Sequence, residues 1–325
     1  MSLAMCAAAL PNAAAHTRSV LAPGDYSFSL KHDGAQRTYL VHMPPQAARG
    51  APLAVVLNFH GAGSNARQQE HYTRMDGAAD RDGFIAVYPN GSVRLDGHFT
   101  WNAGFCCAYA MTHRVDDVGF VMALIDDLAA RTPIDRRRVY ATGLSNGAML
   151  SYRLAAQAAG AIAAIAPVAG SMVTGDFAPA RPIPIMAFNS VDDPLLHYNG
   201  GYGRSVSSLF HRKLGNPGVE AGLAKWRKFD GCPAQPQIAP TVDGQAGTNN
   251  QGITATRYQW APCRDGTQIV LWKLTGAGHV WPGGIQAHFE RVLGRSTDLI
   301  EANELMWQFF SRYRLPRAAP RALAQ

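Results

Sequence analysis

Residues 143–147 read Gly-Leu-Ser-Asn-Gly, and this stretch is the most informative part of the sequence. The run Val-Tyr-Ala-Thr at 139–142 precedes it and predicts a strand, whereas the residues after it have the pattern of a helix. A serine turned sharply between a strand and a helix has a strained backbone, and the flanking glycines leave room for neighbouring backbone and for a substrate. The context therefore predicts a nucleophile elbow that presents Ser145. Because the five-residue pattern is common, this interpretation depends on what else the sequence carries.

A glycine-rich turn upstream of the elbow supplies a second element. The apolar run at 53–59 predicts a buried strand, and it leads directly into His-Gly-Ala-Gly-Ser at 60–64. Backbone N–H groups in such a turn can point at a developing oxyanion. We expect the two donors to be the N–H groups of Ala62 and of Asn146, the residue after the serine. His60 is expected to brace the turn and not to react.

Two downstream segments supply a carboxylate and a base. One strand-like run ends shortly before Asp192 and Asp193, and another ends shortly before His279. A carboxylate just beyond a strand is well placed to orient a catalytic histidine, and we expect Asp192 to do so, with Asp193 as the alternative. Ser145, Asp192 and His279 then follow the Ser-Asp-His chain order of the α/β-hydrolase fold.

The rest of the chain alternates strand-like and helix-like segments. Residues 26–43 read as a hairpin with Asp-Gly at its turn, which predicts an antiparallel edge. One helix is expected at about 66–81, and strands and helices continue to alternate after it. This order predicts an α/β fold with a mostly parallel central sheet, helices on both of its faces and an antiparallel N-terminal edge.

Three parts are predicted along the chain. Residues 1–20 form a leader or a disordered N-terminus, residues 21–314 form the α/β-hydrolase catalytic domain, and residues 315–325 form a disordered tail. Within the catalytic domain, the pattern breaks down into Gly, Ser, Pro and Asn at about 198–265. We expect a loop-rich excursion there, beside the functional site.

Composition excludes several classes of protein. The chain has 325 residues, of which 47% are hydrophobic and 16% charged, values typical of a globular protein. No apolar run reaches the roughly 18 residues of a membrane span, so none is expected. The net charge of +7 is scattered and accompanies no base-reading motif, so no nucleic-acid partner is expected either. The sequence leaves the oligomeric state open.

Cysteines and the N-terminus indicate a secreted protein, extracellular or periplasmic. Residues 1–16 have an apolar stretch and small residues like those of a secretory leader, although the positive start is missing. Cys6 within it raises lipid attachment as a poorer alternative. The remaining four cysteines suit an oxidising compartment. We expect a Cys232–Cys263 disulfide across the excursion, whereas Cys106 and Cys107 form either a vicinal disulfide or buried thiols; neither pair resembles a metal site.

Taken together, the segments resemble the polyhydroxybutyrate depolymerase-type esterases, a group similar to bacterial feruloyl and acetylxylan esterases. The resemblance spans about residues 35–310. At 189–191 the chain has Asn-Ser-Val where the family usually has His-Gly-Thr, which changes the hydrogen-bonding neighbours of the acid. The motifs that carry the resemblance are His60-Gly61, Trp101-Asn102-Ala103-Gly104, Cys106-Cys107, Asp116-Asp117-Val118-Gly119-Phe120, the elbow at 143–147, Asp192-Asp193-Pro194 and Gly278-His279-Val280-Trp281.

The resemblance implies a serine-dependent carboxylic ester hydrolase that works through an acyl-enzyme, and this chemistry needs no cofactor or metal. The expected substrates are short-chain poly(3-hydroxyalkanoate) esters or oligomers; the alternatives are feruloyl, acetylxylan or aromatic polyester esters. No Thr-rich linker or second substrate-binding module is recognised, which favours short or soluble esters. The rival interpretations are a peptidase and a non-catalytic binding protein on the same scaffold.

Four further side chains need an assignment. Trp281, two residues after the histidine, and Trp101 are expected to line the substrate pocket, with a place in the core as the alternative for each. Asp116 and Asp117 are adjacent carboxylates, a pattern also found in metal ligands and in acid–base pairs. Because they precede a helix, we expect them to cap its first turn instead.

Overall fold

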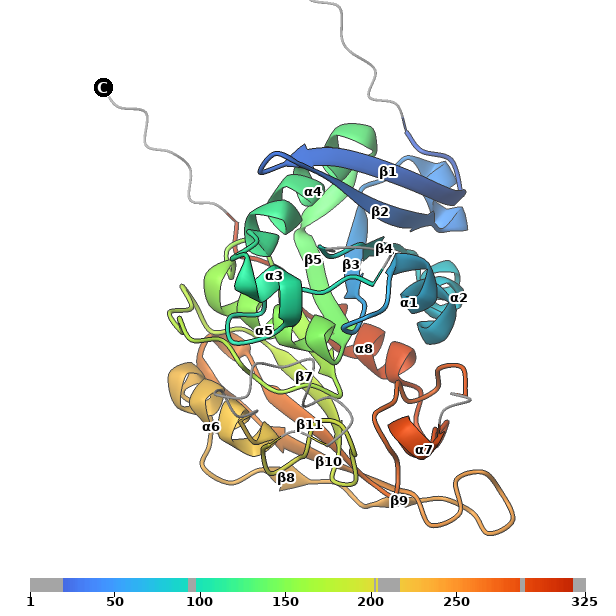
Figure 1. The fold of residues 1–325 in the computed structure, drawn as a ribbon, viewed down its shortest axis with the longest axis vertical. Coiled ribbons are helices and arrows are strands. Elements are labelled where there is room, and N and C mark those ends of the chain that lie inside the picture. Colours follow the sequence, from blue (N-terminus) through green and yellow to red (C-terminus); the bar gives the residue numbers. More distant parts are fainter. Residues whose placement is uncertain (1–19, 93–97, 202, 204–216, 287–289, 318–325) are drawn as a thin grey trace, which may run out of the picture.

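One large sheet forms the centre of the molecule. The computed structural model describes residues 20–92, 98–201, 203, 217–286 and 290–317, and within them eleven strands form a sheet in the order β1-β2-β4-β3-β5-β6-β7-β11-β10-β8, with β9 also paired to β10 (Figure 1). The strands are β1 (Gly24–His32), β2 (Ala35–Met43), β3 (Leu53–Phe59), β4 (Phe84–Pro89), β5 (Ile134–Leu144), β6 (Ala164–Val168), β7 (Ile185–Ser190), β8 (Gln237–Ile238), β9 (Val242–Asp243), β10 (Thr254–Trp260) and β11 (Ile269–Thr275).

The middle of this sheet is parallel and both of its ends are antiparallel. Strands β4, β3, β5, β6, β7 and β11 run in one direction. The β1–β2 hairpin turns at Asp33 and Gly34, which both have positive φ, and β2 pairs antiparallel with β4. The mostly parallel sheet with an antiparallel N-terminal edge is therefore confirmed.

Helices cover both faces of the sheet, as expected (Figure 1). Alternate residues of a strand face opposite sides: in β3, Val55 and Leu57 belong to a core shared with α4, α5 and α6, whereas Ala54 and Val56 belong to a core shared with α1, α2 and α8. The helices are α1 (Ala66–Thr73), α2 (Met75–Asp82), α3 (Ala108–Thr112), α4 (Asp117–Arg131), α5 (Asn146–Gln157), α6 (Val219–Asp230), α7 (Glu290–Leu293) and α8 (Ala302–Phe310).

Two segments differ from the sequence prediction. The single helix expected at 66–81 is two helices, α1 and α2, because Arg74 between them has a left-handed backbone with φ of 54°. The stretch expected to be loop-rich contains α6 and β10, and β10 extends the sheet beyond β11. Its predicted disulfide, Cys232–Cys263, is confirmed, with an S–S distance of 2.03 Å.

Several predictions fall outside the described residues. Residues 1–19 of the predicted leader, Cys6 among them, and all but three residues of the tail belong to this undescribed part. Within the described ranges, none of the helices has both the length and the apolar character that crossing a bilayer requires.

Candidate active site

Ser145 lies on a sharp turn between β5 and α5, as the elbow motif predicts. Its φ of 56° and ψ of −116° are rare for a residue with a side chain, and its N–H donates to the Val168 carbonyl at 2.9 Å. The flanking glycines are required by close packing. A Cβ at Gly143 or Gly147 would lie 2.5 or 2.2 Å from the Phe59 carbonyl oxygen. The turn is thus held by β3 and β6, the two strands beside β5.

The carboxylate that contacts the histidine is Asp193, which corrects the expectation for Asp192. Asp193 Oδ2 lies 2.7 Å from His279 Nδ1, and both side chains are about 95% buried. Asp193 Oδ1 accepts the N–H groups of Leu195 and Leu196 at 2.8 and 2.9 Å. With its acceptors occupied in this way, the carboxylate can hold the imidazole through Nδ1–H.

Asp192 has a different role. Its side chain is exposed at the surface, and its Oδ2 accepts the N–H of Gly276 at 2.6 Å. The turn after β7 explains the outcome: Ser190 Oγ donates to the Ala277 carbonyl and also accepts the N–H of Asp192. This arrangement leaves Asp193, not Asp192, facing the interior. Two adjacent carboxylates after a strand look alike in a sequence, and only the turn distinguishes them.

The three elements meet at one edge of the sheet. Ser145, Asp193 and His279 follow the carboxyl ends of β5, β7 and β11, which run parallel, and β7 and β11 are neighbours. The backbone N–H of His279 donates to the Leu293 carbonyl at 2.5 Å, and this bond fixes the backbone at the histidine. Between the described side chains of Ser145 and His279, the structure shows no hydrogen bond. Hydrogen bonds between catalytic groups often tighten only when a substrate binds.

The expected oxyanion donors lie beside the serine. The turn after β3 approaches it closely, since a Cβ at Gly61 would lie 3.5 Å from Ser145 Cβ. Asn146 is the first residue of α5, so its N–H belongs to the helix-start groups that lack an intrahelical acceptor. The positive end of the helix dipole also favours negative charge there. Donation by Ala62 and Asn146 to a bound substrate stays a prediction.

His60 braces this turn, as expected. It is fully buried, its Nδ1 lies 2.8 Å from the Gly61 carbonyl oxygen, and its Nε2 lies 3.1 Å from the Gly91 nitrogen. Because a backbone N–H can only donate, Nε2 is the acceptor and Nδ1 carries the proton. Burial lowers the pKa of His60 to about 4, so the ring is neutral at pH 7.

Both tryptophans lie in the core, which corrects their assignment to the substrate pocket. Trp101 and Trp281 are 0% and 1% exposed. The Trp101 indole donates to the His60 carbonyl at 2.9 Å, and the Trp281 indole donates to Asn303 Oδ1 at 3.1 Å. A large ring whose single N–H is satisfied inside the protein gains most from full burial. The sequence position near a reactive residue does not reveal this.

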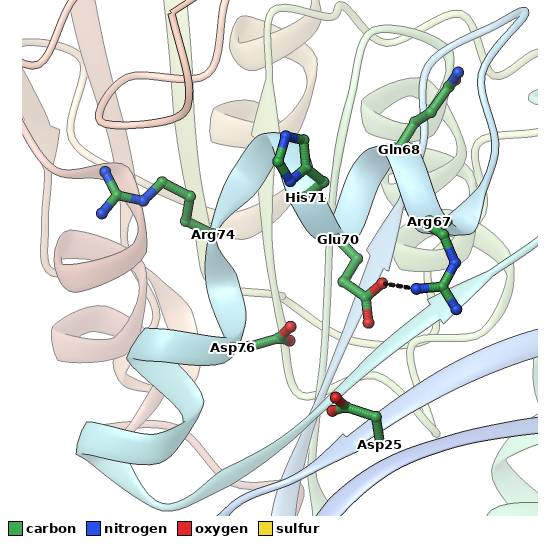
Figure 2. Close-up of a pocket in the computed structure, with 7 residues that line it drawn as sticks. All are labelled: Asp25, Arg67, Gln68, Glu70, His71, Arg74 and Asp76. Carbon is green, nitrogen blue, oxygen red and sulfur yellow. Dashed lines mark ion pairs between the residues drawn. The ribbon is translucent and has the colours of Figure 1, made fainter.

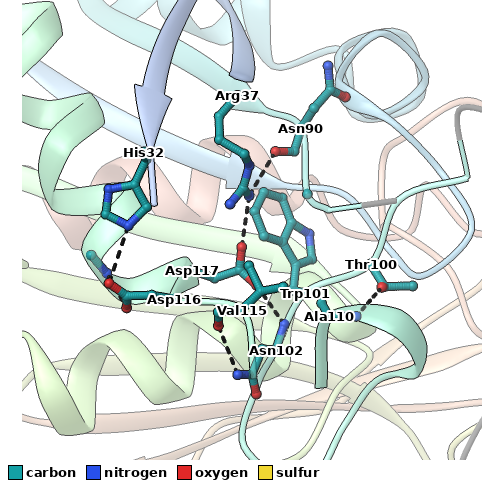
Figure 3. Close-up of polar contacts among 12 residues, drawn as sticks. His32, Arg37, Asn90, Thr100, Trp101, Asn102, Ala110, Val115, Asp116 and Asp117 are labelled. Carbon is teal, nitrogen blue, oxygen red and sulfur yellow. Dashed lines mark hydrogen bonds and ion pairs between the residues drawn. The ribbon is translucent and has the colours of Figure 1, made fainter. Parts of the chain in front are cut away.

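The paired carboxylates at the start of α4 are structural, and Figure 3 shows their contacts. Asp116 caps the helix as predicted, because its Oδ1 accepts the Gly119 N–H at 2.9 Å. Asp117 does not cap the helix, contrary to expectation; it is fully buried and accepts from Arg37 at 2.8 Å and from the Asn102 N–H at 2.7 Å. Burial raises the pKa of Asp117, and the Arg37 charge opposes that shift.

This network supports the elbow, a role that sequence reasoning missed. Asn102 follows Trp101, whose N–H donates to Asn146 Oδ1 at 2.7 Å and whose carbonyl accepts from Asn146 Nδ2 at 3.0 Å. The Asn146 side chain therefore ties the residue after the serine to segment 101–102, and Asp117 ties that segment to Arg37 on β2. The only signal for this role in the sequence was Asn102, a polar residue in the otherwise apolar motif at 101–104.

Cys106 and Cys107 are joined as a vicinal disulfide, the first of the two predicted alternatives. Cys106 Sγ lies 3.9 Å from Asn146 Nδ2, so this disulfide is close to the elbow. Both cysteines belong to a small buried apolar cluster that is separate from the two main cores. Its other buried members are Ala103, Met149, Val173 and Leu196.

The cavity drawn in Figure 2 is lined by a different set of residues. It has a volume of about 610 Å³ and takes its walls from β1, α1 and the start of α2. None of the predicted site residues lines it. Its lining residues are Asp25, Arg67, Gln68, Glu70, His71, Arg74 and Asp76.

Known proteins resemble this chain in sequence and in fold. The family described as "Esterase PHB depolymerase" matches residues 37–201, just over half of the chain. The bifunctional acetylxylan esterase/xylanase XynS20E of Neocallimastix patriciarum is 30% identical over 249 residues, which are 77% of this chain and 32% of that protein. Feruloyl esterase B of Piromyces equi is 30% identical over 236 residues, which are 71% of this chain and 40% of that protein.

The chain thus spans less than half the length of either of these two curated relatives. Among solved structures, the acetyl xylan esterase from Aspergillus awamori has a TM-score of 0.53 and 14% sequence identity. That comparison covers 88% of this chain and 99% of the other. At this level of identity the similarity establishes the α/β-hydrolase fold.

Proposed function

The chain belongs to the PHB depolymerase esterase family, and from that premise we propose that it is a serine-dependent carboxylic ester hydrolase. The observation that carries the proposal is the pair formed by His279 and the buried Asp193, on the same sheet edge as the strained Ser145. We also propose that residues 21–314 form the catalytic domain. The disulfides Cys106–Cys107 and Cys232–Cys263 support an exported protein, because such bonds persist in oxidising compartments.

In the proposed first half-reaction, Ser145 Oγ attacks the ester carbonyl while His279 Nε2 takes the hydroxyl proton. Asp193 holds the imidazole through Nδ1 and stabilises its positive charge. The carbonyl oxygen becomes an anion that accepts hydrogen bonds from the N–H groups of Ala62 and Asn146, and each such donor contributes about 3–4 kcal/mol to lowering the barrier. His279 then gives the proton to the leaving alcohol, and an acyl-enzyme remains.

Water completes the reaction in the second half. His279 Nε2 takes a proton from water as the water oxygen attacks the acyl-enzyme carbonyl, and it returns the proton to Ser145 Oγ when the acid leaves. Every proton moves through His279, and because hydrolysis changes no oxidation state, no redox partner is needed. No step draws on a cofactor.

Two substrate classes are supported. The family name favours short-chain poly(3-hydroxyalkanoate) esters or oligomers, whereas the names of the two relatives favour feruloyl or acetylxylan esters. Wild-type turnover of hydroxybutyrate oligomers, methyl ferulate and acetylated xylan separates these classes. A peptidase would cleave peptide anilides instead.

The decisive variant is Ser145→Ala. We expect it to abolish hydrolysis of p-nitrophenyl acetate, because the nucleophile is gone, while circular dichroism and thermal melting stay unchanged. The matched control is Ser29→Ala, a serine exposed on β1, which should keep wild-type turnover. Full activity in Ser145→Ala would refute the proposal. A non-catalytic binding protein would show no turnover in any of the three proteins.

A further inference from the structure

Phe105 is an exposed aromatic ring on a loop near Ser145. It is 48% exposed, and it is the only aromatic among the large hydrophobic residues that are exposed in the described ranges. Single exposed apolar residues are normal on protein surfaces. Its position, between Gly104 and the vicinal disulfide, is what distinguishes it.

The loop that carries Phe105 is fixed to the elbow. At its start, Trp101 makes two backbone hydrogen bonds to the side chain of Asn146, the residue after the serine. At its end, the Cys107 N–H donates to the Trp101 carbonyl at 3.0 Å, and Ala103 donates to the Cys106 carbonyl at 2.5 Å. The loop is therefore a closed turn whose position depends on Asn146, not a free surface segment.

The same loop also packs beside the acid. Cys106 and Cys107 share the small apolar cluster with Met149 of α5 and with Leu196. The N–H of Leu196 donates to Asp193, and the N–H of Met149 donates to the Ser145 carbonyl. Phe105 thus emerges from a cluster that touches the backbone on both the serine and the acid sides of the site.

A second loop holds the Phe105 ring. The Phe105 N–H donates to the Val173 carbonyl at 3.2 Å, and its ring lies against Gly175, where a Cβ would come within 2.7 Å of Cζ. This loop follows β6, and a Cβ at Gly170 near its start would lie 2.8 Å from the Ser145 carbonyl oxygen. One part of the ring is packed by Gly175, and the part left exposed is available to a ligand.

We propose that Phe105 binds the acyl group of the substrate and favours aromatic, hydroxycinnamoyl-type acyl groups over aliphatic hydroxyalkanoyl groups. This inference rests on the proposed ester hydrolase function. A fixed ring that contacts the acyl group can stack on, or meet edge-to-face, a second ring joined to the ester carbonyl by two carbons. Such ring pairs change a binding constant by about 2- to 12-fold. An aliphatic chain lacks this contribution.

The test compares methyl ferulate, methyl 3-hydroxybutyrate and p-nitrophenyl acetate. In Phe105→Ala, the ratio of kcat/KM for methyl ferulate to that for methyl 3-hydroxybutyrate should fall about 2- to 12-fold. The change should lie in KM for methyl ferulate, because the contact forms in the ground state as well as in the transition state. Phe105→Tyr, which keeps a ring, should restore the wild-type ratio.

The control is Val242→Ala, which shortens an exposed apolar side chain on β9. Strand β9 pairs with β10 at the end of the sheet opposite the N-terminal hairpin. It should leave the ratio at the wild-type value. Two results for Phe105→Ala would overturn the inference: an equal loss of kcat/KM for all three esters, or an unchanged ratio of kcat/KM for methyl ferulate to that for methyl 3-hydroxybutyrate. A wild type that hydrolyses methyl 3-hydroxybutyrate but not methyl ferulate would also overturn it. Absence of p-nitrophenyl acetate turnover in the wild type would instead refute the proposed function itself.

Discussion

Asp192 and Asp193 are neighbours in the chain with opposite environments, and this contrast defines the site at the scale of single residues. Asp193 is buried and bonded to His279, whereas Asp192 is exposed and bonded to a backbone N–H. A carboxylate that orients a histidine works by selecting one tautomer and by stabilising the imidazolium. Only Asp193 touches the ring, so the two carboxylates should respond differently to the same substitution.

We expect Asp193→Asn to lower kcat for p-nitrophenyl acetate by roughly 10³- to 10⁴-fold, because an amide that donates to Nδ1 selects the wrong tautomer. Asp192→Asn is the matched control and should stay within a few-fold of the wild type, because Asn can still accept the Gly276 N–H. Steady-state kinetics on both variants measure the difference. The reverse order of effects would show that the resting arrangement is not the reacting one.

Asp230, at the end of α6, gives a prediction about pH. Burial raises the pKa of Asp230 to about 7, although Arg264 and Arg181 partly oppose the shift. An unfolded aspartate has a pKa of about 3.9, so the folded state binds this proton more tightly. The contribution of Asp230 to stability is therefore fully present below about pH 4 and is lost as the pH rises through 7.

Asp230→Asn removes this titration. Its free energy of unfolding should exceed that of the wild type by about 1–3 kcal/mol at pH 8, and the difference should shrink as the pH falls toward 4. Urea unfolding at several pH values provides the measurement, with Asp243→Asn on the exposed strand β9 as the control. A difference that does not vary with pH would contradict the assignment.

At the scale of elements, the junction between β5 and α5 is packed tightly against β3. Gly147 lies in the first turn of α5, and all three atoms nearest to a Cβ there belong to the backbone of Phe59 and His60. Backbone cannot move aside as a flexible side chain can. The glycine after the serine is therefore a packing requirement between the helix and β3.

We expect Gly147→Ala to lower the free energy of unfolding by roughly 2–4 kcal/mol, because the helix must shift away from β3. Gly160→Ala is the control: a Cβ there meets no atom within 4 Å, so its effect should stay within about 0.5 kcal/mol. Chemical denaturation of both variants tests the pair. Equal free energies of unfolding for Gly147→Ala and Gly160→Ala would mean that the junction accommodates the methyl group at no cost.

At the scale of the whole molecule, the sequence predicted the architecture well because hydrophobic periodicity and chain order determine it. The hairpin, the parallel centre and the position of the elbow are all local patterns. Features that depend on tertiary contacts were not accessible: which of two adjacent carboxylates turns inward, the burial of Trp101 and Trp281, and the break at Arg74. The helix and strand inside the excursion were missed because the stretches around them, which contain Gly, Pro and Asn, interrupt the alternating pattern.

We propose that Ser145 is a nucleophile activated by His279, whose ring Asp193 orients. Reaction with a fluorophosphonate, followed by mass spectrometry of the peptides, tests it most directly, since only an activated serine forms the adduct rapidly. We expect one adduct, on Ser145, in the wild type, and an adduct formed orders of magnitude more slowly in His279→Ala. An adduct on another residue, or equally rapid labelling without the imidazole, would contradict it.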